Sequence, residues 1–84
     1  MKTLIYSIRD RQINAFMQPW CAQAHGQATR MFTDEVNNKE SSMYKHPADY
    51  DLYYIGDWDG DTGNLYALKE GPEQIAIGDN VKER

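Results

Sequence analysis

The chain has 84 residues, of which 40% are hydrophobic and 12% aromatic, so it is long enough for one small domain and too apolar to remain disordered. Its apolar runs are too short to cross a membrane, and Arg9, Asp10 and Arg11 interrupt the N-terminal segment before the apolar stretch of a signal peptide can form. The net charge of −4 argues against strong nonspecific binding to duplex DNA, because that affinity comes mainly from cations that contact phosphate.

The first predicted strand covers residues 3–9, where side chains alternate in a segment rich in β-branched and aromatic residues. Ala15–Met17 is a weak second strand that can pair with the first as a hairpin. Pro19 ends it, because proline lacks the amide hydrogen that a strand ladder needs. A helix is predicted over residues 24–37, since apolar residues recur there at helical spacing and form one stripe, namely Ala24, Ala28, Met31, Phe32 and Val36.

Residues 38–47 are polar and predict a connecting loop, and Pro47 can open a short helical turn. The second clear strand is predicted at 51–56. A turn rich in glycine and aspartate separates it from a returning strand at 65–69. After a turn at Gly71–Pro72, a short last strand is predicted at 73–77.

These elements predict a single domain over residues 1–84, in which residues 78–84 form a frayed tail. The fold class is α+β, with a small antiparallel sheet of three to five strands and one α-helix packed on one face. Apolar residues occur on both faces of the strands, and one helix cannot cover both. We therefore expect the other face to be exposed or covered by a second subunit, which makes the chain a homodimer; its aromatic side chains would include some of Tyr6, Tyr53, Trp58 and Tyr66.

Charge is distributed unevenly along the chain. Residues 1–33 contain four basic residues and one acidic residue, a net charge of +3, whereas residues 34–84 carry −7. This asymmetry fits head-to-tail self-association, contact between the basic segment and phosphates, or a solvated surface without a partner.

Arginines and aromatic residues form a candidate site for single-stranded nucleic acid, in which cations follow the backbone and rings stack on bases. The residues assigned to this site are Arg9, Arg11, Arg30, Tyr6, Trp20 and Tyr53. The alternative interpretation is that Tyr6, Phe16 and Phe32 form the core and that the arginines are solvated, since a small domain needs its aromatic residues for burial.

The acidic turn matches two motifs only in part. Asp57, Asp59 and Asp61 resemble the start of a calcium loop, but Thr62 and Leu68 stand where an EF-hand needs glycine and glutamate. The triplet that begins at Asp61 matches aspartic proteases, but it lies in a segment typical of an exposed turn. We expect no metal and no cofactor at this turn.

Cys21, His25 and His46 are the remaining candidates for chemistry. They fall short of a structural zinc set, and a Cys–His nucleophile pair also needs an orienting group and an oxyanion hole. A small thiol near two surface histidines is the favoured interpretation, so we do not expect an enzyme.

Short segments occur in order over nearly the whole chain and together carry a family resemblance. They are Ile8-Arg9-Asp10, Phe16-Met17-Gln18-Pro19, the helix with Gly26, Ala28, Arg30 and Phe32 leading into Asp34-Glu35-Val36-Asn37, the run from Tyr44 to Tyr53, the turn from Gly56 to Gly63, and Pro72-Glu73-Gln74 before Gly78. The ordered set resembles the small nonstructural protein of gokushoviruses, the tailless single-stranded DNA phages of the Microviridae.

The resemblance implies a phage protein that is made in the host bacterial cytoplasm and is absent from the capsid. Members of this family are usually described as nonstructural or DNA-binding. By analogy with the small bullavirus protein that switches synthesis from duplex to packaged single strands, they are thought to act in genome replication. The resemblance supplies no catalytic residues.

Two hypotheses of function follow. In the first, a non-enzymatic phage accessory protein oligomerises and contacts single-stranded DNA during genome replication or packaging, through its arginines and exposed aromatic rings. In the second, an adaptor docks the replication initiator or the procapsid through its sheet face and acidic hairpin, without direct contact to DNA. Neither hypothesis involves a membrane.

Overall fold

The computed structural model describes residues 1–83. Their elements, in chain order, are β1 (Lys2–Asp10), β2 (Ala15–Phe16), β3 (Trp20–Ala22), α1 (His25–Val36), α2 (Ser42–Lys45), the 3-10 helix η1 (Pro47–Asp49), β4 (Tyr50–Asp59), β5 (Leu65–Ala67), β6 (Glu73–Ile77) and α3 (Gly78–Val81). The fold is α+β, as the sequence predicts.

The strands β1 and β4 form the centre of an antiparallel sheet. They pair along their whole length, from Lys2 opposite Asp59 to Asp10 opposite Tyr50. Both β2 and β3 pair with β1, while β5 and β6 pair with β4, so the sheet has six strands. The sequence predicts at most five strands. The strand that it does not predict is β3, which is only three residues long and directly follows Pro19.

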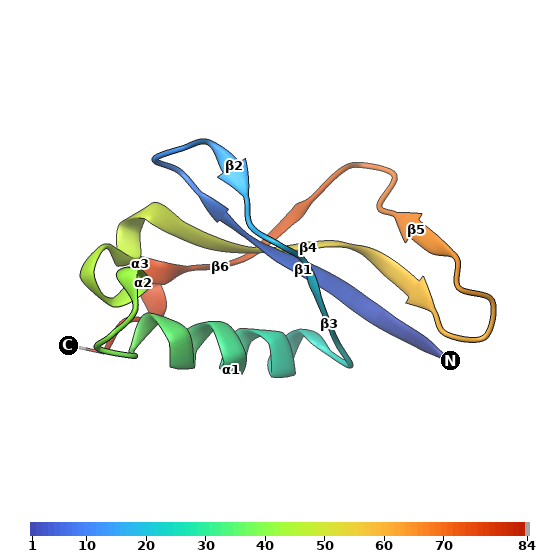
Figure 1. Cartoon of the computed structure of the whole chain (residues 1–84), viewed down its shortest axis with the longest axis horizontal. Coiled ribbons are helices and arrows are strands. Elements are labelled where there is room, and N and C mark those ends of the chain that lie inside the picture. Colours follow the sequence, from blue (N-terminus) through green and yellow to red (C-terminus); the bar gives the residue numbers. More distant parts are fainter. Residues whose placement is uncertain (84) are drawn as a thin grey trace.

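The helix α1 packs against one face of this sheet (Figure 1). Residues directly opposite each other on antiparallel strands point to the same face. The pairs Tyr6–Tyr54 and Ile8–Leu52 therefore belong together on the α1 side, where the helix buries Phe32. The buried core consists of Tyr6, Ile8, Ala22, Ala28, Phe32, Val36, Met43, Tyr50 and Leu52.

The predicted α1 is confirmed within one residue at each end, but the polar loop and the tail are more ordered than expected. Ser41 caps α2 by accepting a hydrogen bond from the amide of Met43, which is buried. The expectation of a frayed tail from residue 78 is wrong for its first residues, because Gly78–Val81 forms α3. Gly78 is buried so closely that a Cβ atom there would lie 2.2 Å from the carbonyl oxygen of Pro47.

Candidate functional site

The sheet face opposite α1, which we call the open face, is not covered by any helix of the described residues. In Figure 1 the β1–β2 hairpin and the segment that joins β5 to β6 both rise above this face, on either side of the point where β1 and β4 cross. The open face is therefore flanked by the β1–β2 hairpin and by the segment that joins β5 to β6.

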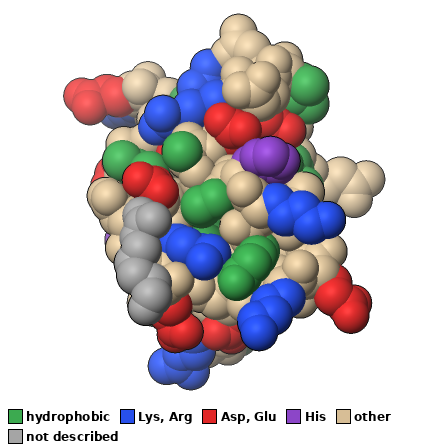
Figure 2. All heavy atoms as spheres, turned by 90° about the vertical axis from the view of Figure 1, so that its left-hand side faces the viewer, with side chains coloured by type: hydrophobic (Ala, Val, Ile, Leu, Met, Phe, Trp, Pro, Cys, Tyr) green, Lys and Arg blue, Asp and Glu red, His purple; other side chains and the backbone are tan. Residues whose placement is uncertain are grey.

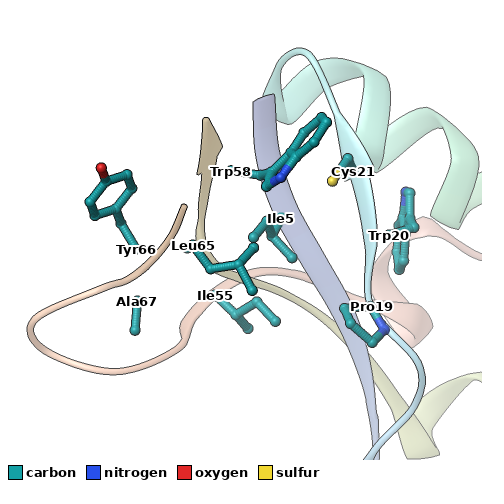
Figure 3. Close-up of a pocket in the computed structure, with 10 residues that line it drawn as sticks. Ile5, Pro19, Trp20, Cys21, Ile55, Trp58, Leu65, Tyr66 and Ala67 are labelled. Atoms are coloured by element: carbon teal, nitrogen blue, oxygen red, sulfur yellow. The ribbon is translucent and has the colours of Figure 1, made fainter. Parts of the chain in front are cut away.

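An apolar groove of about 480 Å³ lies on the open face, next to the β4–β5 hairpin. Figure 3 shows the ring of Trp58 lying across β1 toward Cys21, while Leu65 extends toward Ile5 and Ile55. Tyr66 points away from the groove, and Trp20 lies on the far side of β3. No charged residue lines the groove among the residues that the structure describes; the lining is Ile5, Pro19, Trp20, Cys21, Ile55, Gly56, Trp58, Leu65, Tyr66 and Ala67.

Strand register explains why these side chains gather. Ile5 is opposite both Cys21 on β3 and Gly56 on β4, so all three share the open face. The register shifts by one residue beyond Ile5, which leaves Ile55 as the extra residue of a bulge in β4. Because a Cβ atom on Gly56 would lie 2.4 Å from the carbonyl oxygen of Tyr66, only glycine lets β5 approach β4 this closely.

Large apolar side chains are exposed at both ends of the open face. Beside the groove, Trp58 is 38% and Leu65 is 71% exposed. On the β1–β2 hairpin, Ile13 is 70% exposed, and Phe16 and Met17 are each 45% exposed. Exposed apolar side chains grouped on one face usually mark an interaction surface.

Tyr6 is wrong as a residue that stacks on bases, because the structure buries it completely. It points toward α1, and its hydroxyl shares a hydrogen bond of 2.5 Å with Nδ1 of His25. Trp20 is half-buried beside it, with the two ring centres 6.1 Å apart. These rings therefore contribute to packing under the sheet, and neither ring stands free on the open face.

The three predicted arginines do not converge on one surface. Arg11 forms an ion pair with Asp51, in which Nε lies 2.7 Å from Oδ2 and the Nη2 atom 3.1 Å from Oδ1. Arg9 donates a hydrogen bond to the side chain of Asn14. Arg30 is exposed on α1, which lies on the other side of the sheet. The predicted site is thus divided between two layers of the molecule.

The local charge near the β1–β2 hairpin is also not positive. Asp10 and Asp49 lie at the same turn, where they accept hydrogen bonds from the backbone and the side chain of Gln12, and Asp51 neutralises Arg11. Figure 2 shows Lys and Arg side chains interspersed with Asp and Glu over the end of the molecule that carries α2 and α3. A basic first third of the sequence therefore does not become a basic face.

Of the predicted aromatic residues, Tyr53 does lie on the open face, since it is paired with Ser7. The ring of Phe16 meets it edge to face, with centres 5.2 Å apart, and Phe16 is the β2 partner of Arg9. Arg9, Tyr53 and Phe16 are the part of the predicted site that the fold brings together.

Asp57 organises a second polar cluster, which lies on the α1 side. The hydroxyl of Tyr54 donates a hydrogen bond of 2.5 Å to Oδ1 of Asp57, and this bond, with burial, raises the pKa of Tyr54 to about 12. Burial, together with the Asp57 charge, also raises the pKa of Tyr6. The ring of His25 meets that of Tyr54 edge to face at 4.9 Å.

The acidic tip of the β4–β5 hairpin is held by contacts within the chain. The N-terminal amine of Met1 contacts both Asp59 and Asp61. The backbone amide of Asp61 donates a hydrogen bond to Asp59, which lowers the pKa of that carboxyl group. The three aspartates of this turn, within the described residues, do not form a cluster that could hold a metal ion.

A family model described as Phage ORF5 protein matches residues 3–82, nearly the entire chain. The chain belongs to this family of phage proteins. Neither the curated proteins nor the solved structures contain a match to it. The family match confirms the phage origin that the ordered segments imply.

In the described part of the chain, no helix is long and apolar enough to cross a membrane.

The groove itself was not predicted, although some of its signals are present in the sequence. Ile5 is the apolar exception among the residues of β1 that face away from α1, and Trp58 and Leu65 flank the acidic turn on both sides. Their convergence depends on the β4 bulge and on β3, neither of which follows from residue patterns alone.

Proposed function

We propose that this phage protein is a non-enzymatic accessory protein that works by protein–protein contact through the open face of its sheet. The observation that carries the proposal is the uncharged groove beside Trp58 and Leu65. Apolar grooves favour partners that bury apolar side chains. The phosphate backbone of DNA offers no such surface and requires cations to neutralise it.

The proposed setting is the host bacterial cytoplasm, in complexes that replicate or package a single-stranded DNA genome. The match to a family of phage proteins supports the phage origin alone. Replication or packaging is proposed from the resemblance to gokushovirus nonstructural proteins. In this setting the chain would be an adaptor, and the replication initiator and the procapsid are the two candidate classes of partner.

Direct contact with single-stranded DNA is the second candidate function, favoured by Arg9, Phe16 and Tyr53 on the open face. Aromatic rings on an open sheet can stack on bases, and an arginine can contact the backbone. Against it stand the carboxylates at the same turn and the pairing of Arg11 with Asp51. We therefore rank it below protein contact.

Photo-crosslinking from the groove tests the first candidate. Cys21 is an exposed free thiol in the groove lining, so a thiol-linked photoreactive group placed there reports what covers the open face. In an extract of host cells infected with the parent phage, we expect crosslinks to a phage-encoded protein. The matched control carries the group on α1, in the Cys21→Ser/Met31→Cys double variant, since Met31 is 48% exposed and lies away from the groove. Equal labelling from both positions, or labelling of DNA alone, would refute protein contact at this face.

Fluorescence anisotropy with a labelled single-stranded oligonucleotide at low and moderate salt tests the second candidate. Contact through Arg9 and Phe16 predicts saturable binding that Arg9→Ala weakens, with log affinity falling by about 0.7 per phosphate contacted as log salt rises. The Arg30→Ala variant is the control, since Arg30 lies on the α1 layer. An absence of binding at low salt would exclude this candidate.

A further inference from the structure

We propose that the occupant of the groove is a second copy of this chain, whose β1–β2 hairpin enters the groove while its own groove receives the hairpin of the first. This inference rests on the proposed function, because it names the partner of the same open face. It follows from the position, composition and area of two features that the structure places on that face.

The groove and its complement are both present in one chain. The β1–β2 hairpin carries Ile13, Phe16 and Met17 as exposed apolar side chains. It projects from the sheet on the side opposite α1 (Figure 1), and the groove lies on that same face. The groove has no charged lining among the described residues, so it suits an apolar projection of this kind.

The placement of these features fits a closed dimer. The described chain is elongated, with extents of 42 × 23 × 18 Å. Figure 1 shows β2 and β5 on either side of the β1–β4 crossing, and the groove lies at the β4–β5 hairpin. Two copies that stack open face to open face, with their long axes antiparallel, bring each hairpin to the groove of the other. A two-fold axis then makes both contacts identical, and the assembly closes at two copies instead of growing into a fibre.

The available apolar area is close to what a stable interface needs. Four side chains, each between 38% and 71% exposed, are available to the partner in this arrangement, namely Ile13, Phe16, Trp58 and Leu65. Taking roughly 200 Å² for a large apolar side chain, they offer about 450 Å² per copy. A standard interface takes about 800 Å² from each partner, of which just over half, about 450 Å², is apolar.

Sedimentation velocity of the full chain, from low micromolar to several hundred micromolar, tests the dimer. We expect a monomer–dimer equilibrium that added salt does not weaken, because the contact is apolar and each copy carries a net charge of −4. Leu65→Lys places a charge on a 71% exposed residue, so the fold should survive. Since each dimer loses this contact twice, its dissociation constant should rise at least about a hundredfold. Met31→Lys on α1 is the matched control and should leave the dimer unchanged.

A pair of complementary variants tests the reciprocal geometry. Leu65→Lys and Ile13→Glu should each prevent self-association, because each homodimer would contain two charges against apolar surfaces. Mixed together, they should form a heterodimer that keeps one wild-type contact and opposes the introduced ammonium and carboxylate groups at the other. Two variants that fail alone and also fail together would overturn the reciprocal arrangement.

Sedimentation velocity and crosslinking from the groove together distinguish the dimer from contact with a different protein. A wild-type chain that remains monomeric at the highest concentration overturns the dimer. If the groove of that monomer still crosslinks a different phage protein, protein contact at the open face stands. A monomer whose groove crosslinks no protein refutes both.

Discussion

Replacing Arg11 with alanine tests whether this arginine stabilises the fold or contacts nucleic acid. Arg11 bonds both carboxylate oxygens of Asp51, and the side chain of Asp51 is only 1% exposed. Arg11→Ala therefore leaves a buried carboxylate without its cation. Removing one partner of a fully buried ion pair lowers the free energy of unfolding by about 3–5 kcal/mol. The side chain of Arg11 is 45% exposed, so water can partly replace it. We therefore expect Arg11→Ala to lower the free energy of unfolding by about 2–3 kcal/mol.

Urea unfolding monitored by circular dichroism measures this loss. A domain of this size has a free energy of unfolding of about 4–13 kcal/mol. With a slope of about 1 kcal/mol per molar urea, the midpoint should fall by about 2–3 M. Arg9→Ala and Arg30→Ala are the controls, and each should change the free energy of unfolding by less than about 1 kcal/mol. In the background of Asp51→Asn, which removes the buried charge, Arg11→Ala should cost less than about 1 kcal/mol.

A different pattern of stability and binding would show that Arg11 does not stabilise the fold. If Arg11→Ala left the midpoint within the range of the two controls while it weakened binding to a single-stranded oligonucleotide, Arg11 would be a phosphate ligand. The ion pair with Asp51 would then have no structural role, and the nucleic-acid interpretation of the first third of the chain would regain its strongest residue.

Three further predictions concern the packing and titration of single residues. The hydrogen bond to Asp57 raises the pKa of Tyr54 to about 12. This bond should therefore stabilise the fold fully below about pH 10 and lose its effect as the pH rises through 12. Ultraviolet titration should show a late-ionising tyrosine, and Tyr54→Phe should remove it. Gly78→Ala should lower the free energy of unfolding by about 2 kcal/mol or more, as measured in urea, because its Cβ atom would meet the carbonyl oxygen of Pro47 at 2.2 Å. Phe32→Ala should cost about 3–5 kcal/mol in the same assay, since Phe32 is 1% exposed under the sheet.

Local patterns predicted the main elements well. Alternation placed β1 and the first part of β4, the apolar stripe placed α1, and the acidic turn placed the β4–β5 hairpin. The same patterns failed where tertiary contacts decide the structure. The polar segment that contains Met43 became helical because Ser41 caps it and Met43 enters the core. The tail became ordered because Gly78 packs against Pro47.

The candidate site was predicted less well than the fold. Sequence position shows that Arg9, Arg11 and Arg30 are near one another in the chain, but it does not show that α1 carries Arg30 to the other layer. Nor does it show that Asp51, from the distant β4, neutralises Arg11. Tyr6 was expected to serve either the core or a binding face, and its register opposite Tyr54 decides for the core.

The reactivity of Cys21 most directly tests the claim that a second copy of the chain covers the open face. Cys21 is exposed and lines the groove, so its reaction with an aromatic disulfide reagent reports whether the groove is open. If a second copy covers the groove, the rate constant per thiol should fall several-fold as the chain concentration rises through the dimer range, and Leu65→Lys should abolish this dependence. A rate constant that stays the same at all concentrations, for the wild-type chain as for Leu65→Lys, would show that a second copy does not cover the groove.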